Sequence, residues 1–545
     1  MLALVVSGCA QSHTRDGARS SDAGQIDAGR IDTGRPDAAG ADAALEDAGD
    51  SGAPLDGGCQ EPPWELVVAA RWTAPEDAYQ AQPHVSATPL VLPPARVGAP
   101  VRLAFVSHGT LRGNVDAPAE VGRMQVEPGG VLRIVELDAD GTPAVTRSWG
   151  RLPLLLELAS TSTLAAADLD ADGELELVAM GAQLGTYAFE LDATLLWESR
   201  TPPLPPELAG SPRRPQYSVS GAPTVADLDG DGALEVVVGG CVLDGRTGSR
   251  RFCVDDGANY RGSHGYWGPI TEVADLDADG QLEVLGGPSV YDASGTVRWT
   301  TSGYESGFGG IGEFIVGSPG PEVVLVRRGG IELLDRDSGS RLTFMRMRGA
   351  ATVLPVQTCD PDTPPSNWPH FAGGPPLVAD LDRDGSDEVV VSSGGFLSRF
   401  DPDCRGCEER WGVPVDDLSA ASSAMAADLR GDGTLDIVHA DQHRLRIIDG
   451  ESGAVWLSVP HVARGRTEYP VVADLDGDGS AEILVGVSTE YCSMWPMIGP
   501  PVAAGVTIYR ERHNRFAGAP ARWTQHAPAG GRVAARSSDS RTLCR

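Results

Sequence analysis

The fold of this 545-residue chain is decided by a stretch that recurs along it, best preserved at Asp227-Leu228-Asp229-Gly230-Asp231-Gly232-Ala233-Leu234-Glu235-Val236-Val237-Val238. Carboxylates stand at every second position from Asp227 to Asp231, and another follows at Glu235. Gly232 permits the sharp turn that such a loop needs. The three valines after Glu235 favour a β-strand, because β-branched residues fit a pleated, half-buried surface. The stretch therefore predicts an acidic loop that leads directly into a buried strand.

The pattern returns at intervals of roughly 38 to 67 residues, most of them close to 47, which suits one four-stranded propeller blade per repeat. A sixth copy, which runs from Asp428 to Asp436, carries Arg430 in place of the second aspartate. Two eroded copies keep apolar strands without the acidic loop, near residues 313–326 and 89–106. The intact copies begin at Asp168, Asp227, Asp275, Asp380 and Asp474. Eight units without helical periodicity predict an all-β fold, a seven- or eight-bladed β-propeller.

Two further features indicate how the ring is assembled. The segment 64–72 reads as a blade strand that precedes the first repeat, so it can pair with the C-terminal strands around residues 506–509 and close the ring. A tryptophan ends the hairpin in most repeats, and we expect it to pack between blades. These residues are Trp149, Trp197, Trp299, Trp411, Trp456 and Trp523.

These repeats resemble the FG-GAP/VCBS family, the bacterial relatives of the N-terminal β-propeller of the integrin α-chain. The resemblance covers about 480 residues and rests on six acidic loops that recur in phase. It implies calcium-binding loops like those of the integrin propeller. It also implies that a ligand is bound at the face of the ring opposite these loops.

The spacing within each loop suits calcium on chemical grounds as well. Carboxylates at the first, third and fifth positions can converge on one centre, the seventh residue can add a backbone carbonyl, and the ninth acid can close the shell. Six to eight hard oxygen ligands favour Ca²⁺ over Mg²⁺, which demands a stricter octahedron. The loop is not an EF-hand, because its closing carboxylate falls at position nine and a strand follows. The alternative is an acidic surface turn without metal.

The predicted ligands follow this numbering in every copy, and we expect a structural role for about five Ca²⁺ ions. Arg430 supplies positive charge to the sixth loop, where weak or no binding is expected. The ligand set is Asp168, Asp170, Asp172, Glu174, Glu176; Asp227, Asp229, Asp231, Ala233, Glu235; Asp275, Asp277, Asp279, Gln281, Glu283; Asp380, Asp382, Asp384, Ser386, Glu388; Asp428, Asp432, Asp436; and Asp474, Asp476, Asp478, Ser480, Glu482.

Composition excludes several functions. The formal net charge is −33, and all 43 basic residues are arginine, so there is no Schiff-base or phosphate-loop lysine. A chain this acidic without a basic patch repels nucleic acid, so we expect no nucleic-acid partner. No apolar run approaches the length of a membrane-spanning helix.

The N-terminal part differs from the repeats. Residues 1–9 end in Val5-Val6-Ser7-Gly8-Cys9, which resembles the lipobox of bacterial lipoproteins and predicts lipidation of Cys9. Residues 10–58 have little to bury and carry an aspartate every five residues from Asp22 to Asp47, which predicts a disordered, self-repelling tether before the propeller of residues 59–545. We therefore expect a lipid-anchored protein of the bacterial cell envelope, surface-exposed or periplasmic; the alternative is a disordered tail without an anchor.

The cysteines fit this extracytoplasmic setting. Once a lipidated Cys9 is set aside, eight remain, an even number that is typical of disulfides. Cys241 and Cys253 stand on opposite arms of one predicted hairpin and can pair. Cys404 and Cys407 have the spacing of a redox motif but sit at a hairpin tip, which favours a small structural disulfide.

The connections between blades are long and carry aromatic side chains on the face opposite the acidic loops. Phe308 and Tyr469 are among them, and the principal ligand-face candidates are Tyr266, Trp267, Trp368, His370 and Trp495. Exposed aromatics suit stacking on sugar rings or anchoring a protein partner. The alternative is that these side chains pack on one another and fill the mouth of the ring.

We therefore expect a monomeric, non-catalytic, calcium-stabilised propeller that is displayed at the cell surface and binds a protein or glycan ligand in adhesion or recognition. The alternative is a polysaccharide-acting enzyme, a lyase or hydrolase. Most acids belong to the acidic loops and no Gly-x-Ser-x-Gly motif occurs, which leaves His264 and His370 as the positions to test for catalysis.

Overall fold

The computed structural model describes residues 62–94, 96, 99–109, 129–150, 158–181, 185–200, 221–254, 270–301, 307–318, 320–327, 329–348, 373–403, 409–417, 422–463, 468–489 and 503–519. The chain divides into two units, Met1–Cys59 and Gln60–Arg545, and the described residues all belong to the second. Cys9 and the predicted tether lie outside the described residues. Within the described part, no helix is long and apolar enough to cross a membrane.

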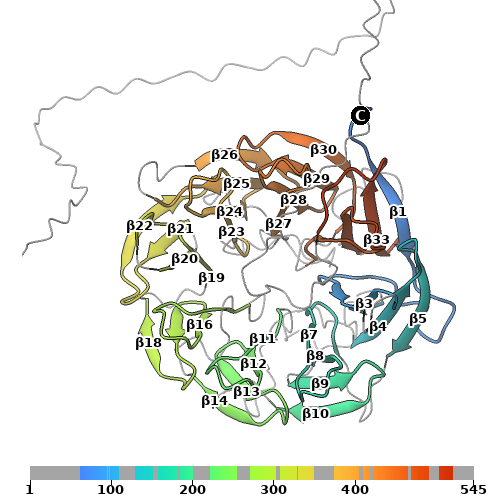
Figure 1. Ribbon diagram of the computed structural model, residues 1–545, viewed down its shortest axis with the longest axis horizontal. Coiled ribbons are helices and arrows are strands. Elements are labelled where there is room, and N and C mark those ends of the chain that lie inside the picture. The colour runs from blue at the N-terminus through green and yellow to red at the C-terminus, as the bar shows by residue number, and fades with distance from the viewer. Residues whose placement is uncertain are drawn as a thin grey trace, which may run out of the picture. The chain divides into compact units, whose positions relative to one another are not determined.

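The second unit consists of eight antiparallel sheets, or blades, arranged around a ring (Figure 1). Blade 1 consists of β2 (Leu90–Leu92), β3 (Arg102–Ser107), β4 (Gly129–Leu137) and β5 (Pro143–Trp149), with β6 (Leu158–Ala159) paired to β4. Blade 2 consists of β7 (Ala165–Ala167), β8 (Glu176–Met180), β9 (Thr186–Glu190) and β10 (Leu195–Ser199). Blade 3 consists of β11 (Thr224–Ala226), β12 (Glu235–Val238), β13 (Cys241–Asp244) and β14 (Arg250–Cys253), and blade 4 of β15 (Glu272–Ala274), β16 (Glu283–Gly286), β17 (Ser289–Tyr291) and β18 (Val297–Thr300).

Blades 5 to 8 complete the ring. Blade 5 consists of β19 (Phe308–Gly312), β20 (Glu322–Arg327), β21 (Gly330–Leu334) and β22 (Arg341–Arg346). Blade 6 consists of β23 (Leu377–Ala379), β24 (Glu388–Ser393), β25 (Phe396–Phe400) and β26 (Glu409–Pro414). Blade 7 consists of β27 (Ala424–Ala427), β28 (Asp436–Ala440), β29 (Arg444–Asp449) and β30 (Val455–Pro460), and blade 8 of β31 (Val471–Ala473), β32 (Glu482–Val487), β33 (Gly505–Glu511) and β1 (Leu66–Trp72). The all-β propeller is confirmed with eight blades, and the two eroded repeats form blades 1 and 5.

The ring is closed by strands from the two ends of the unit. β1 pairs antiparallel with β33, with Leu66 opposite Glu511 and Trp72 opposite Val506. This confirms the pairing predicted for residues 64–72. The closure gives blade 8 its fourth and outermost strand from the opposite end of the unit.

The second strand of every blade is almost wholly buried. Val236, Val237 and Val238 of β12 are fully buried, which explains why these strands read as continuous apolar runs instead of alternating patterns. The hairpin that follows holds a disulfide between Cys241 and Cys253, which face each other across β13 and β14. This confirms the predicted pair.

Three of the six tryptophans predicted to pack between blades join neighbouring blades, and Trp523 lies outside the described residues. The indole N–H donates to a backbone carbonyl in the turn between the third and fourth strands of the next blade, from Trp197 to Gly245, from Trp299 to Arg336 and from Trp411 to Gly450, at 2.6 to 3.0 Å. A glycine with positive φ in the same turn lies directly against each ring. Trp456 differs, because its indole N–H donates to Asp436 of its own blade at 3.1 Å.

We predict that Gly248→Ala will lower the free energy of unfolding by about 2 to 4 kcal/mol. A Cβ atom there would lie 2.4 Å from the Trp197 ring, and the φ of +66° is unfavourable for alanine. Urea unfolding checks this, with Gly317→Ala as the matched control, since Gly317 has a φ of +86° but nothing within 4 Å of the added atom. Equal losses in both variants would show that the interblade contact contributes nothing.

Candidate metal centres

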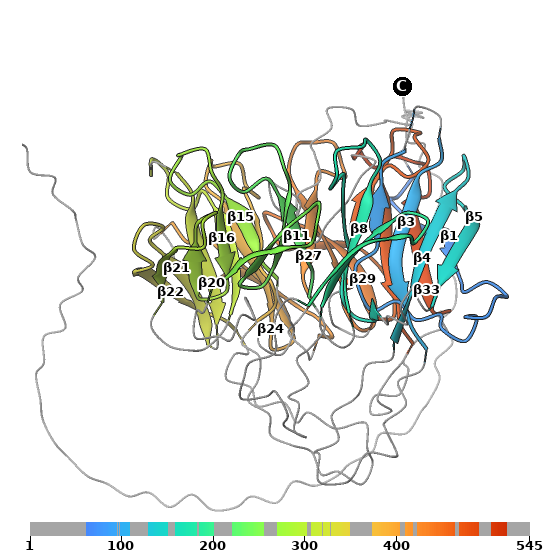
Figure 2. The same cartoon turned by 90° about the horizontal axis from the view of Figure 1, so that it is seen from below.

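The acidic loops share one face of the ring. Strands within a blade alternate in direction, so the loop between the first and second strands lies on the same face as the turn between the third and fourth. The connections from one blade to the next leave from the opposite face. Figure 2 shows the ring from the side, with these two faces above and below the blades.

Five groups of three carboxylates converge among the described residues, and they belong to the five intact loops predicted from the sequence. In each group, one oxygen per residue lies within 4.8 Å of the others. The groups are Asp168, Asp170 and Glu176; Asp227, Asp229 and Asp231; Asp275, Asp277 and Asp279; Asp380, Asp382 and Glu388; and Asp474, Asp476 and Asp478. These clusters can hold metal ions.

The other predicted ligands lie in the same loops but outside these groups. They are the fifth-position acids Asp172 and Asp384, the ninth-position acids Glu235, Glu283 and Glu482, and the seventh residues Glu174, Ala233, Gln281, Ser386 and Ser480. Each seventh residue donates its backbone N–H to the carboxylate of the fifth residue, at 2.6 to 2.9 Å. The role of the seventh carbonyl as a ligand stays a prediction.

Backbone hydrogen bonds fix the shape of each loop, as blade 2 illustrates. The carboxylate of Asp168 accepts the N–H groups of Asp172 and Gly173, both at 3.1 Å. One oxygen of Glu176 accepts the N–H of Leu169 at 2.6 Å. The first and ninth acids therefore hold the loop closed. Each still has carboxylate lone pairs that can bind an ion at the centre of the loop.

Two positions in each loop adopt a left-handed backbone. The sixth is always glycine, as at Gly232 with a φ of 88°, which confirms the turn expected there. The fourth position is left-handed too, although Ala171, Ala278 and Arg383 occupy it in three blades. The sequence did not indicate this second position, because residues other than glycine rarely adopt such a φ.

The ninth acids are buried, and this burial has an electrostatic cost. Glu176 is fully buried, its Oε1 atom has no hydrogen-bond partner among the described residues, and burial raises its pKa to about 7, with further contributions from nearby Glu190 and Asp170. Burial likewise raises the pKa of Glu388 and of Glu482 to about 8. A bound cation would offset this cost, since it favours the ionised carboxylates.

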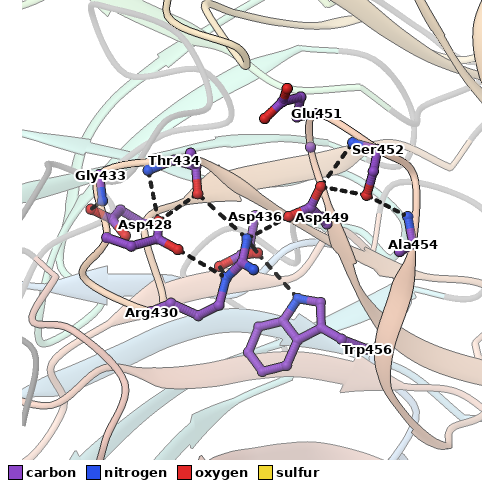
Figure 3. A network of polar contacts seen from close by, with 12 residues as sticks. Asp428, Arg430, Gly433, Thr434, Asp436, Asp449, Glu451, Ser452, Ala454 and Trp456 are labelled. Carbon is purple, nitrogen blue, oxygen red and sulfur yellow. Dashed lines mark hydrogen bonds and ion pairs between the residues drawn. The ribbon is translucent and has the colours of Figure 1, made fainter. Parts of the chain in front are cut away.

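The sixth loop, in blade 7, holds a guanidinium among its acids (Figure 3). One nitrogen of Arg430 lies 2.8 Å from Asp436 and 2.7 Å from Asp449. The Trp456 indole N–H donates to the same Asp436 oxygen at 3.1 Å, and burial raises the pKa of Asp436 to about 7 despite the arginine. Asp428, Asp432 and Asp436 form no group of three converging carboxylates among the described residues. The geometry agrees with the expectation that this loop binds metal weakly or not at all.

We predict that Arg430→Asp will give blade 7 a metal site and add one bound Ca²⁺ per chain. The substitution restores the third carboxylate and removes the cation that pairs with Asp436. Native mass spectrometry at fixed free calcium counts the bound ions, with Arg430→Ala as the control that removes the charge without adding a ligand. An unchanged count in Arg430→Asp would contradict the prediction.

The ligand-face candidates Tyr266, Trp267, Trp368, His370 and Trp495 lie outside the described residues, as do His264, Cys404 and Cys407. Two further aromatics placed on that face are described, and both are interior. Phe308 is 1% exposed and Tyr469 3% exposed. For these two the expectation of exposure was wrong, because the strand β19 and the start of blade 8 turn them into the packed wall of the ring.

One buried polar cluster gave no signal in the sequence. Ser422 donates to Asp417 at 2.5 Å, and its hydroxyl lies 3.1 Å from Nε2 of His439. The Nδ1 atom of His439 has no hydrogen-bond partner among the described residues, and burial lowers its pKa. Ser392 of blade 6 donates to the same carboxylate at 2.8 Å, so Asp417 joins blades 6 and 7 through polar contacts.

The fold is an eight-bladed β-propeller, and one segment of it matches a known repeat family. The sequence profile of the FG-GAP-like repeat family matches residues 428–485, which hold the arginine-bearing loop of blade 7 and the intact loop of blade 8. The predicted resemblance is thus confirmed over these residues. No curated protein sequence matches the chain.

Among solved structures, the chain is similar to the V. cholerae biofilm matrix protein Bap1, with 16% identity, a TM-score of 0.62, and coverage of 88% of this chain and 97% of that one. It is also similar to a Bacillus licheniformis rhamnogalacturonan lyase, with 15% identity, a TM-score of 0.35, and coverage of 75% and 89%. A europium-containing methanol dehydrogenase shows 11% identity, a TM-score of 0.46, and coverage of 82% and 93%. At such identities the likeness concerns the fold alone, and a propeller scaffold serves binding proteins and enzymes alike.

Proposed function

We propose that this protein is a calcium-stabilised propeller of the bacterial cell envelope that binds a protein or glycan ligand and does not catalyse a reaction. One observation carries the calcium part. The five converging carboxylate groups coincide with the five intact repeats, and buried carboxylate oxygens such as Oε1 of Glu176 and of Glu482 have no hydrogen-bond partner among the described residues. A hard divalent cation with a high coordination number fits this donor set.

The proposed ligand site is the face opposite the acidic loops. The acidic-loop face is taken up by the loops and the short turns beside them. The opposite face carries the connections between blades, and those from β10 to β11 and from β22 to β23 are far longer than any turn on the acidic-loop face. Binding residues concentrate on such loops, because a rigid scaffold positions them. The likeness in fold to a biofilm matrix protein supports an extracellular binding role.

The place of the protein in the envelope is part of the proposal. Lipidation of Cys9 would supply the anchor, and the acidic segment 10–58 would hold the propeller away from the membrane. The disulfide between Cys241 and Cys253 supports an oxidising compartment. No membrane contact beyond the lipid is proposed, and the propeller acts as a monomer.

A glycan array probed with the full chain in calcium tests the binding role. We expect Trp267→Ala and Trp368→Ala to abolish capture of the bound glycan, while Phe344→Ala, which removes an exposed aromatic from the outermost strand β22, leaves it intact. Capture of no glycan on the array would point to a protein ligand. Cleavage of the captured glycan by the wild-type chain would instead establish the polysaccharide-acting enzyme.

A further inference from the structure

The five candidate metal loops are not equivalent, because arginine reaches into some of them. In blade 3, Arg251 lies 2.6 Å from Asp229 and also contacts Glu235. In blade 4, Arg298 makes the same two contacts, 2.6 Å from Asp277 and 2.8 Å from Glu283. Each arginine thus bridges the third and ninth acids of its loop, two of the residues proposed to ligate the ion.

A β-bulge places these arginines. Val242 pairs with Phe252 and Leu243 pairs with Arg250, so Arg251 is the extra residue of the outermost strand. Arg298 is the extra residue at the same point of blade 4. A bulge turns its additional side chain out of the regular alternation, here towards the loop.

The corresponding bulge residue in the other blades with an intact loop is different. It is Leu196 in blade 2 and Ala69 in blade 8, and neither side chain carries charge. In blade 6 the bulge residue is Arg410, which pairs with Asp401. There Arg399 bridges the third and ninth acids instead, at 2.5 and 3.4 Å.

Blade 2 is the clearest contrast. No ion pair to Asp170 or Glu176 occurs among the described residues, and Glu190 adds a further negative charge nearby. Arg246 approaches this loop from blade 3, but it donates to the backbone carbonyl of Asp170 and leaves the carboxylates unpaired. In this loop, therefore, no arginine pairs with the third or the ninth acid among the described residues.

We propose that Arg251, Arg298 and Arg399 compete with the metal ion for the carboxylates of their loops. Calcium then binds more weakly in blades 3, 4 and 6 (the weak class) than in blades 2 and 8 (the tight class). This inference rests on the calcium binding proposed above. Calcium affinity depends on the number of ligand charges, and a guanidinium that already pairs with two of them must be displaced first. The same arginines stabilise their loops when calcium is absent, so the propeller keeps these blades formed at low calcium.

A reciprocal pair of variants of the full chain tests the proposal. Arg251→Leu gives blade 3 the bulge residue of blade 2, and Leu196→Arg does the reverse. Isothermal titration calorimetry with Ca²⁺ reports both site classes, and native mass spectrometry counts the ions bound at limiting calcium. We expect Arg251→Leu to move one site into the tight class with at least tenfold higher affinity, and Leu196→Arg to move one site out of it. Arg147→Leu is the control, because Arg147 is exposed and pairs with Glu136 in blade 1, which has no acidic loop.

A second measurement keeps the result interpretable if a variant is destabilised. In chelator, Arg251→Leu should unfold at a lower temperature than the wild type, and in calcium the difference should shrink or reverse. Site affinities that stay within twofold of the control would overturn the proposal, as would weaker binding in Arg251→Leu, which would mean that the arginine supports the bound ion. If the wild type binds no calcium at all, the proposed function fails as well.

Discussion

Calcium added to the chelator-treated protein should raise its midpoint of thermal unfolding by more than about 10 °C. Each of five loops brings three carboxylates within 4.8 Å of one another, and like charges so close repel strongly in a partly buried setting. A ligand present at a hundred times its Kd stabilises a protein by about 2.7 kcal/mol per site, so several sites together give an effect of this size. Thermal unfolding followed by circular dichroism measures the shift.

Magnesium is the matched control for this prediction. Mg²⁺ requires a near-ideal octahedron and gives up its water reluctantly, so we expect less than a third of the calcium shift at equal concentration. In the double variant Asp168→Asn, Glu176→Gln, the calcium shift should shrink by the share of one site, while stability in chelator rises because buried like charges are removed. An equal midpoint with and without calcium would refute the metal sites in this chain.

The sequence predicted the loops because their ligand spacing is local. Five groups of acids within nine residues of one another converge wherever the loop folds, so Asp168 and Glu176 could be paired without knowledge of the blade. Ring closure was predictable for another reason: a strand-like segment at 64–72 needs a partner, and β33 provides one.

The arginines of the sites could not be predicted in the same way. Arg251 stands beside Arg250 in the sequence, and only the bulge in β14 decides which of the two turns to the loop. Phe308 illustrates the same limit, since an aromatic residue at the end of a long connection is buried or exposed according to where the strand begins. Such features depend on register and packing, which single-sequence patterns do not encode.

The seam that closes the ring depends on one buried ion pair. Arg515 is 1% exposed and lies 2.6 Å from the fully buried Glu511. Its guanidinium also donates to the carbonyls of Pro62 and Pro63, and it lies 4.2 Å from the centre of the Trp64 ring. The arginine thus ties the segment after β33 to the segment that leads into β1.

Glu511 depends on this partner for its charge. Burial alone would raise the pKa of its carboxyl, but hydrogen bonds from Arg515 and from the backbone N–H groups of His513 and Arg515 outweigh burial and lower it. A lowered pKa means that the group stabilises the fold above its unfolded pKa, and that this contribution fades as the pH falls through the folded value. Without Arg515 the burial of this carboxylate is less well compensated, and we expect an ionised Glu511 to favour the unfolded chain at neutral pH.

Arg515→Ala should therefore lower the free energy of unfolding by about 3 to 5 kcal/mol at pH 7, the cost of leaving a buried charge without its partner. Arg512→Ala is the matched control: Arg512 lies three residues earlier and pairs with Glu65 at 2.5 Å, but both side chains are about half exposed, so its loss should cost far less than that of Arg515. Urea unfolding in saturating calcium measures both variants.

The loss of unfolding free energy in Arg515→Ala should shrink when the pH is lowered towards the ordinary pKa of glutamate. Glu511→Gln in the same chain should recover part of this loss, because either change removes the unpaired charge of Glu511. A deficit that is independent of pH and of residue 511 would mean that Arg515 acts through its contacts with Trp64 and the proline carbonyls alone.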